Sequence, residues 1–361
     1  MRRALCASFA FFAISLALCE KPQDRADEIL LGLSDIERVA QVFLISVAGD
    51  STFTPLEFQE DGRAALPGGF ILFSYNVSGD ASQLKGYIES AKQSYAANAS
   101  LAPYVAVDQE GGLVNRLRGV TSPLPSQKEV AGSLTPAQAQ ALYSSQAKEL
   151  YSLGIALNLA PVAEAELASN RLFLTTRTFG DLPASCVYSI VCVRAYEENG
   201  VGTVAKHFPG NANADPHTGA VEITASRDEV FSHFVLPFAF TLAASPSAVL
   251  MSHAKVVQLD SSPACTSRFW IEDVLRGMLG FEGLVISDDI FMKALSDSSP
   301  EQTALDAISS GVDVIMYSEK RFLSIARFLL DEAARDPVFA GRLFDAERKV
   351  VSFKLAKGII E

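Results

Sequence analysis

Short runs of apolar residues recur along the chain and alternate with amphipathic stretches. The runs cover residues 41–47, 69–74, 104–108, 156–161, 203–207, 248–253, 284–287 and 312–317. Most of them are continuously apolar rather than alternating in polarity, which is typical of parallel strands covered on both faces. The pattern therefore predicts a parallel β-sheet that is buried on both sides.

Between these runs the apolar residues repeat with helical spacing. The clearest helical stretches are residues 82–97, 136–153, 184–199, 227–239, 268–279 and 302–309. Thr135 before Pro136, and Ser226 before an acidic turn, are typical helix N-termini. Strands alternating with helices over about 300 residues indicate the α/β class, as a (β/α)8 TIM-type barrel in a single catalytic domain. An open, doubly wound sheet is the alternative for the same pattern.

The first 19 residues have the pattern of an export signal. Arg2 and Arg3 precede an apolar stretch that runs to residue 18, after which the chain turns polar. About 15 apolar residues are short for a membrane span, which usually needs about 20. Residues 16–19 also resemble a lipoprotein processing site with Cys19 as the lipidated residue, although Leu18 stands where a small residue is usual. We expect an exported, periplasmic or envelope-associated protein; an uncleaved N-terminal anchor is the alternative.

The rest of the chain shows no internal division. Residues 20–32 form a polar entry segment, and residues 33–361 contain no linker, repeat or low-complexity tract, so they are read as one barrel domain. Hydrophobic residues make up 49% of the sequence, enough for a sizeable core, and the formal net charge is −12. Such an acidic chain repels phosphate backbones, so a nucleic-acid partner is not expected.

The cysteines and histidines do not predict a metal site or a disulfide framework. Cys186 and Cys192 share a predicted helix, where six residues separate them by about 9 Å of rise, too far for a disulfide. There is no CxxC motif, and no His-x-His pair ends an early strand, as a metal-dependent barrel hydrolase would require. We therefore expect no metal and no cofactor.

Polar residues cluster where the predicted strands end. In barrel enzymes the active site lies at the C-terminal ends of the strands, so residues at these positions should converge on one mouth. Five successive strands end in or are followed by such residues: Asp108 and Glu110, Glu164, Lys206 and His207, His253, and Asp288 and Asp289. A single buried charge would more often be a structural pair, but five equivalent positions indicate an active site.

Five segments carry a resemblance to a known family. They are residues 107–112, 159–162, 177–180, 206–210 and 286–289, which read VDQEGG, LAPV, RTFG, KHFPG and ISDD. In this order the chain resembles glycoside hydrolase family 3, and in particular its single-domain β-N-acetylglucosaminidase (β-N-acetylhexosaminidase) branch. The resemblance extends from about residue 33 to beyond residue 317.

The resemblance implies that Asp288 is the nucleophile. A carboxylate suits this task because it can form a glycosyl ester and then leave. Asp289 is the neighbouring candidate, but adjacent strand residues point to opposite faces, so it is expected to have a structural role. The family branch uses an Asp-x-His pair as acid/base, which matches Asp215 and His217. Pro216 favours an extended shape for Asp215, and in an extended segment residues two apart share a face.

The resemblance also implies a sugar-binding set. Its members are Asp108, Arg116, Arg177, Lys206 and His207, whose donors and acceptors can orient a polyhydroxylated ring. For Arg116 and Arg177, an ion pair at the barrel rim is the alternative. His253 is expected near the site without an assigned role, and His233 is expected to be structural.

The chain departs from the family pattern in the loops. Residues 211–214 replace the usual His-Gly and acidic stretch after KHFPG, and the loop is about two residues shorter. Leu113 and Asn115 stand where Arg and Gln are common, and residues 166–176 lack the usual Asn/Pro-rich pattern. These changes affect the loop and the leaving-group side more than the nucleophile.

These features predict a retaining hydrolase that removes terminal β-linked N-acetylglucosamine from peptidoglycan fragments or related oligosaccharides. One alternative is a phosphorylase, because a histidine acid/base leaves less negative charge facing an incoming phosphate. A second is a non-catalytic glycan-binding envelope lipoprotein. The expected partner is an N-acetylglucosamine-containing saccharide, and a membrane is contacted only through a lipid on Cys19. The sequence leaves the oligomeric state open.

Overall fold

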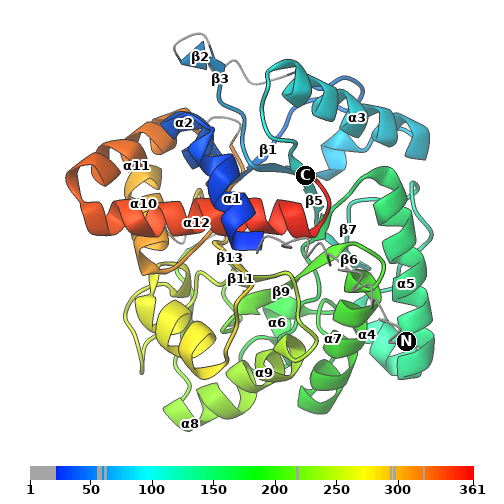
Figure 1. Cartoon of the computed structure of the whole chain (residues 1–361). Coiled ribbons are helices and arrows are strands. Elements are labelled where there is room, and N and C mark those ends of the chain that lie inside the picture. The colour runs from blue at the N-terminus through cyan, green and yellow to red at the C-terminus, as the bar shows by residue number, and fades with distance from the viewer. Residues whose placement is uncertain are drawn as a thin grey trace, which may run out of the picture.

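The structure is a computed structural model that describes residues 22–54, 59–60, 63–216, 219–292, 295, 298–319 and 322–361. Its centre is a sheet of eight parallel strands in the order β13-β11-β9-β8-β5-β4-β1-β14 (Figure 1). The strands are β1 (Phe43–Ser46), β4 (Gly69–Leu72), β5 (Tyr104–Val107), β8 (Leu157–Asn158), β9 (Gly202–Phe208), β11 (Ala248–Met251), β13 (Leu284–Ile286) and β14 (Ile315–Tyr317). Each lies within or overlaps one of the eight predicted apolar runs.

The two edge strands of this sheet meet and close it into a barrel. Ile286 forms a parallel bridge with Val314, and the Ser287 N–H donates to the Val314 carbonyl at 2.9 Å. Closure removes the free edges that an open sheet would leave. The predicted (β/α)8 barrel is confirmed, and the open, doubly wound alternative is excluded.

Burial on both faces explains why the strand runs are continuously apolar. On β5, Tyr104 and Ala106 belong to the cluster that fills the barrel, whereas Val105 and Val107 pack in a cluster outside it. Side chains alternate along a strand, so a strand covered on both faces needs apolar residues at every position.

Helices surround the barrel and cover its outer face (Figure 1). The larger ones are α3 (Ala81–Ala97), α5 (Pro136–Leu153), α7 (Leu182–Glu197), α10 (Pro300–Ser310) and α11 (Leu323–Arg335). The side chains of Thr135, Asp181 and Ser299 accept hydrogen bonds from backbone N–H groups in the first turns of α5, α7 and α10. These caps satisfy donors that have no partner within the helix, which is why the helices begin where they do.

Two predicted helices contain wide, π-type turns. The stretch predicted over residues 227–239 consists of α8 (Arg227–Glu229), the π-helix η3 (Val230–Val235) and α9 (Leu236–Leu242). Pro237 is the second residue after η3 and has no N–H to continue an α-helical ladder. The stretch predicted over residues 268–279 is the π-helix η5 (Phe269–Met278).

Shorter elements connect these units. The connecting helices are α2 (Asp35–Val39), η1 (Ala40–Val42), η2 (Ser74–Asn76), α4 (Gln127–Ser133), α6 (Arg171–Leu174) and η4 (Ala264–Thr266). Three two-stranded pairs complete the strands: β2 (Gln59–Glu60) with β3 (Arg63–Ala64), β6 (Gln109–Gly111) with β7 (Val114–Asn115), and β10 (Glu222–Ile223) with β12 (Lys255–Val256). Within the described part of the chain, no helix has the length and apolarity needed to cross a membrane.

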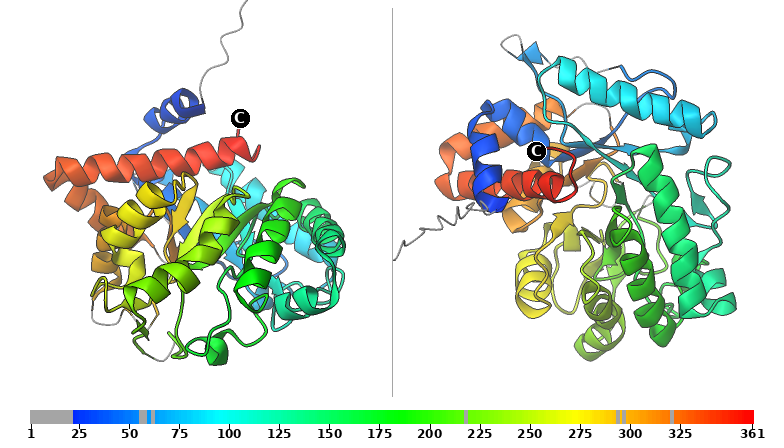
Figure 2. Two further views of the ribbon diagram at one scale, coloured as in Figure 1. Left: turned by 90° about the horizontal axis from the view of Figure 1, so that it is seen from below. Right: turned by 45° about the vertical axis from the view of Figure 1, so that its right-hand side comes forward.

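The C-terminal helix α12 (Pro337–Ala356) closes the end of the barrel at which the strands begin. Its Val350 and Phe353 belong to the cluster inside the barrel, and the Phe353 ring meets the Tyr104 ring edge-on at 5.5 Å. Helix α1 (Pro22–Leu31) packs on the outer side of α12, where Ala26 and Leu30 contact Val351 (Figure 2). Residues 20–32, which were expected only as a polar entry segment, are therefore largely helical and pair with α12. The helices α11 and α12 were not predicted from the sequence.

Lys354, on α12, is fully buried beneath the barrel. Its Nζ donates to Gln41 Oε1 at 2.7 Å, and burial lowers its pKa from the ordinary value of lysine to about 7. In the unfolded chain this amine keeps its proton until about pH 10. Between these two values the unfolded state binds more protons, so the free energy of unfolding should rise with pH across this window.

We expect Lys354→Met to stabilise the protein, and most strongly at pH 6, because the buried amine is then charged in the wild type. The gain should shrink between pH 7 and pH 10, by about 1.4 kcal/mol for each pKa unit crossed. Urea unfolding of both proteins at pH 6, 7.5 and 9 measures this difference. Lys148→Met on the exposed face of α5 is the control. A stability difference that is the same at every pH would show that burial does not lower the pKa of Lys354.

Candidate active site

A cavity of about 450 Å³ opens where the barrel strands end. Its innermost side chains include Ile71, Leu159 and Leu250, which also belong to the cluster that fills the barrel. The cavity therefore ends on the packed core and does not continue as a channel. Barrel enzymes place their active sites at this end, so the cavity is the candidate active site.

Most of the predicted site residues meet in this cavity. Six of them line it: Asp108, Arg116, Arg177, Lys206, His207 and Asp288. They come from segments up to 180 residues apart in the chain and are brought together by the closed barrel. Asp215 directly precedes Pro216, which also lines the cavity. His217, like the signal segment and Cys19, lies outside the described residues.

One side of the cavity is a cluster of paired charges. Lys206 Nζ lies 2.5 Å from Asp108 Oδ1 and 2.7 Å from Glu110 Oε1. Arg177 binds Glu110 through two parallel bonds of 2.8 Å, from Nε and Nη2. Arg116 is looser, with its Nη2 at 3.6 Å from Asp108 Oδ2. Arg177 thus forms the ion pair at the barrel rim that was considered as an alternative to sugar binding. Its guanidinium also lines the cavity.

These pairs keep the buried groups ionised. Burial alone would raise the pKa of Glu110, but Lys206 and Arg177 outweigh it and hold the pKa well below its usual range. Burial likewise acts to lower the pKa of Lys206, and Asp108 and Glu110 reverse this, so the pKa is raised. The cluster thus presents a fixed ammonium and a fixed carboxylate, the donors and acceptors that a sugar hydroxyl needs.

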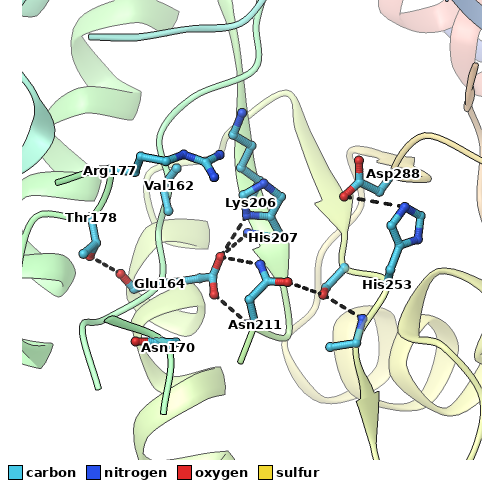
Figure 3. A network of polar contacts seen from close by, with 12 residues as sticks. Val162, Glu164, Asn170, Arg177, Thr178, Lys206, His207, Asn211, His253 and Asp288 are labelled. Carbon is cyan, nitrogen blue, oxygen red and sulfur yellow. Dashed lines mark hydrogen bonds and ion pairs between the residues drawn. The ribbon is translucent and has the colours of Figure 1, made fainter. Parts of the chain in front are cut away.

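Glu164 organises the neighbouring part of the site. Its Oε1 lies 2.8 Å from His207 Nδ1 and accepts from Asn211 Nδ2 at 3.0 Å, and its Oε2 accepts from the Asn211 backbone N–H at 2.7 Å. Figure 3 shows the Glu164 carboxylate joined by dashed lines to both residues. In neutral His207 the proton therefore sits on Nδ1, which leaves Nε2 as the other ring nitrogen for a ligand.

The same network anchors the loop that follows β9. Asn211 Oδ1 accepts from Ser252 Oγ at 3.1 Å, and this hydroxyl in turn accepts from the Ala254 N–H at 2.9 Å. Asn211 is itself buried, with 3% of its surface exposed. This residue, a departure from the family pattern, is therefore the fixed root of the loop that leads to Asp215.

A β-bulge explains how two consecutive residues both reach the cavity. Leu250 is paired with Lys206, but the next residue, Met251, is paired with Phe208, so His207 is the extra residue on its strand. Neighbouring strand residues normally point to opposite faces, and a bulge redirects one of them. Lys206 and His207 therefore line the same cavity.

Asp288 lies at the end of β13 and is largely buried. Its Oδ1 accepts from the Asp289 N–H at 2.9 Å, and its Oδ2 is 3.8 Å from His253 Nε2. Burial would raise the pKa of Asp288, but the pKa is lowered because His253, His207, the Asp289 N–H and Lys206 favour the carboxylate. Asp288 is therefore ionised at neutral pH, as a nucleophile must be.

Asp289 has a different set of partners. Its Oδ1 accepts from the Phe291 N–H and from the Ser318 N–H, both at 3.1 Å. It thus ties the loop after β13 to the end of β14. Asp289 also lines the cavity beside Asp288, so the expectation that only one of the two faces it is not met, and the roles of both stay predictions.

Other contributors to the site were not assigned from the sequence. Glu110 and Glu164 were noted only as polar residues near strand ends, and that position is the signal that marks them. The apolar wall carried no such signal; it includes Phe73, Phe173, Met292 and Met316. Within the described ranges, no three His, Cys, Asp or Glu side chains are grouped so that they could hold a metal ion.

Comparison with known proteins places the chain among glycosidases. Residues 37–348 match the family model described as the glycosyl hydrolase family 3 N terminal domain. The β-hexosaminidase of Tolumonas auensis is 33% identical over 293 residues, which are 78% of this chain and 84% of that protein. β-Hexosaminidase A of Pseudoalteromonas piscicida is 31% identical over 272 residues, or 69% of this chain, but the chain spans only 45% of its length.

A solved structure shows the same architecture. The β-N-acetylhexosaminidase of Beutenbergia cavernae superposes with a TM-score of 0.77 at 29% sequence identity. The match covers 90% of this chain and 99% of that one. The similarity therefore includes the whole barrel.

We expect Glu164→Ala to destabilise the protein by about 2–4 kcal/mol, because it leaves several buried N–H donors without an acceptor. Glu166→Ala is the matched control, since the Glu166 carboxylate pairs with the half-exposed Lys128 and such pairs contribute about 0–1 kcal/mol. Urea unfolding of both variants at pH 7 measures the difference. Equal losses in the two variants would show that Glu164 does not organise the site.

Proposed function

The chain belongs to glycosyl hydrolase family 3, as its motifs predicted, and from this premise we propose that it is a retaining β-N-acetylhexosaminidase. Its substrate is terminal β-linked N-acetylglucosamine in peptidoglycan fragments or related oligosaccharides. The observation that carries the proposal is the ionised Asp288 carboxylate in a cavity that also contains the Asp108, Lys206 and His207 side chains. Such a cavity can bind a sugar with its anomeric carbon within reach of the Asp288 carboxylate.

The proposed reaction has two steps. An Asp288 oxygen attacks the anomeric carbon while the bond to the leaving oxygen breaks, and that oxygen takes a proton from His217. Water then attacks the same carbon, gives its proton to His217 and releases Asp288 as a carboxylate. Two inversions give net retention. Asp215 makes His217 more basic and orients it, as a carboxylate partner does.

The cavity geometry supports action on a terminal sugar. The cavity ends on the barrel core at Ile71, Leu159 and Leu250, so a saccharide chain cannot pass through it. Its volume of about 450 Å³ lies in the range of small-molecule sites. One sugar can enter, with the leaving group directed toward the mouth.

The paired charges support recognition of a neutral, polyhydroxylated ring. Asp108 offers carboxylate oxygens, whereas Lys206 and the Nε2 of His207 offer nitrogen atoms to neighbouring hydroxyls. Arg116 and Arg177 lie on the same wall, where they can donate to the sugar or its N-acetyl carbonyl. Each cation already has a carboxylate partner, so the site does not need a charged ligand to balance it. It can therefore bind a neutral sugar.

We also propose that the protein is exported, with a signal segment that ends at Cys19, and that cleavage before Cys19 leaves this residue as the site of lipid attachment. The basic head, the short apolar stretch and the position of Cys19 support this. The mass of the protein isolated from the envelope of its producing cells tests it. We expect a mature chain that begins at Cys19 and carries added acyl mass. A chain that still begins at Met1 would contradict export by cleavage.

We expect the wild type to release nitrophenol from 4-nitrophenyl N-acetyl-β-glucosaminide, and Asp288→Asn to lose this activity by about 10⁴-fold or more. The amide keeps the size of the carboxylate but cannot form the ester intermediate. Thermal unfolding checks that the variant is folded. Running the assay in phosphate buffer identifies the product, and sugar phosphate instead of free sugar would replace hydrolysis with phosphorolysis. A folded wild type without turnover would leave glycan binding as the function.

In the same assay, the loss of activity in His217→Ala should depend on the leaving group of the substrate. Loss of general acid catalysis costs about 10²–10⁴-fold on a poor leaving group and much less on nitrophenol, which departs without a proton. Azide should restore turnover of the aryl substrate, because it attacks the intermediate without needing a base. Equal losses on aryl and disaccharide substrates would contradict the assigned role.

A further inference from the structure

His253 lies against the nucleophile and has no role in the reaction described above. It follows β11, its side chain is fully buried, and its Nε2 points toward Asp288 Oδ2 across 3.8 Å (Figure 3). That distance is too long for a hydrogen bond, and Nε2 makes no hydrogen bond of normal geometry among the described residues. The Asp289 backbone also acts on the ring and favours its protonated form. Buried polar atoms are normally paired, so an orphan nitrogen beside a reacting carboxylate calls for an explanation.

The other ring nitrogen of His253 is held by a thiol. His253 Nδ1 lies 3.4 Å from the Sγ of Cys265, a buried residue in η4. The backbone holds this pair in register on both sides: the Cys265 N–H donates to the Ser252 carbonyl and the Ala264 N–H to the Ala254 carbonyl, both at 3.0 Å. The thiol is thus fixed opposite the ring by the segment that carries His253.

The thiol determines which nitrogen of His253 carries the proton. Burial, together with the charge of Asp288, raises the pKa of Cys265, so the thiol keeps its hydrogen and can donate it to Nδ1. In a neutral ring the proton then sits on Nε2 and faces Asp288. The opposite tautomer would direct the Nε2 lone pair at a carboxylate, which is repulsive.

One donor does not hold the Asp288 carboxylate in a single orientation. The Asp289 N–H binds only Oδ1, and the last torsion of an aspartate side chain is broad. A second donor on Oδ2 fixes the plane of the carboxylate and hence the direction of its attacking lone pair. Contacts of this kind are often long in the empty site and tighten when the substrate is bound.

We propose that His253 is a positioning residue for Asp288: the Cys265 thiol on Nδ1 keeps the Nε2–H facing Oδ2, and this N–H orients the nucleophile. The proposal rests on the proposed function, because it assumes that Asp288 attacks the sugar. It adds two residues to the machinery, neither of which touches the substrate.

Several charged groups surround this ring. Burial lowers the pKa of His253, Asp288 and Asp289 act in the opposite direction, and His207 lowers it further. The pKa of His253 is lowered overall, so the ring is neutral at neutral pH and acts through its N–H dipole. Asp288 in turn faces His253, His207 and Lys206. Removing the Nε2–H donor should therefore raise the pKa of Asp288 while its other partners stay in place.

Two substitutions of His253 separate orientation from packing. The amide nitrogen of His253→Gln lies near the position of Nε2 and can still donate to Asp288. The shorter amide of His253→Asn reaches only the Nδ1 position. Both variants lose the ring and pack similarly poorly, so a purely structural role predicts similar effects.

We expect kcat/KM on the aryl substrate to fall by roughly 10- to 100-fold in His253→Asn, and its acidic limb to move to higher pH. In His253→Gln the limb should stay near its wild-type position. Cys265→Ser keeps an O–H donor and should resemble the wild type, whereas Cys265→Ala should shift the limb in the same direction as His253→Asn. Cys192→Ala, which removes a buried thiol on α7 away from the site, is the control. Identical limbs in the Gln and Asn variants would overturn the proposal.

A measurement without substrate separates this proposal from the proposed function. The chain has four histidines, so a ¹⁵N-histidine spectrum is simple, and the His253 signals are identified by their absence in His253→Gln. We expect the Nε2–H tautomer at pH 7 and a shift of its ¹⁵N resonance in Asp288→Asn. If turnover is absent but this pattern is seen, the proposed function fails and the arrangement stands. The Nδ1–H tautomer, or a ring unaffected by Asp288→Asn, would refute it whatever the activity.

Discussion

Closure of the sheet is the constraint on which the site depends. The Ser287 N–H and the Val314 carbonyl join the last two strands, and all eight strands then run in the same direction around one axis. Every strand therefore ends at the same rim. Asp108 on one side and Asp288 on another, 180 residues apart in the chain, line one cavity only because the ring is closed.

Placing charges on that rim has an energetic cost, which pairing offsets. Lys206 and Glu110 are both almost fully buried, and neither would stay ionised there alone. Mutual pairing, with Arg177 and Asp108 as outer partners, keeps both charged. The same logic holds at Asp288, where nearby donors offset its burial. The site is thus polar and rigid before any ligand enters, so its groups need little reorganisation during a reaction.

The same hydrogen-bond network also holds the root of the loop that leads toward Asp215. Glu164 is hydrogen-bonded to His207 and Asn211, and Asn211 is hydrogen-bonded in turn to Ser252, which follows β11. Ser252 precedes His253, so the root of the β9 loop and the contact to Asp288, the proposed nucleophile, share one short segment. A change in one of these contacts should therefore affect both the acid/base loop and Asp288 in the proposed reaction.

The sequence by itself determined the architecture and most of the candidate cavity. Continuous apolar runs identify buried parallel strands, and polar residues at their ends identify the rim; together with the motifs, these located Asp108, Lys206, His207 and Asp288. The local sequence pattern is sufficient to find the strands and the rim, because a buried strand and the polar residues at its end are both recognisable within a few neighbouring residues. The helix pair α1 and α12 was missed, since α12 derives its place from a tertiary contact beneath the barrel, where Phe353 meets Tyr104.

Only the tertiary structure decided which charges pair and which groups lie against Asp288. No spacing rule joins Glu110 to Arg177, Glu164 to Asn211, or Cys265 through His253 to Asp288. Those distances depend on the curvature of the barrel and on a bulge at His207, which long-range packing sets. Composition and periodicity describe each segment separately, whereas the protonation and orientation of a buried side chain depend on the neighbours that folding brings to it.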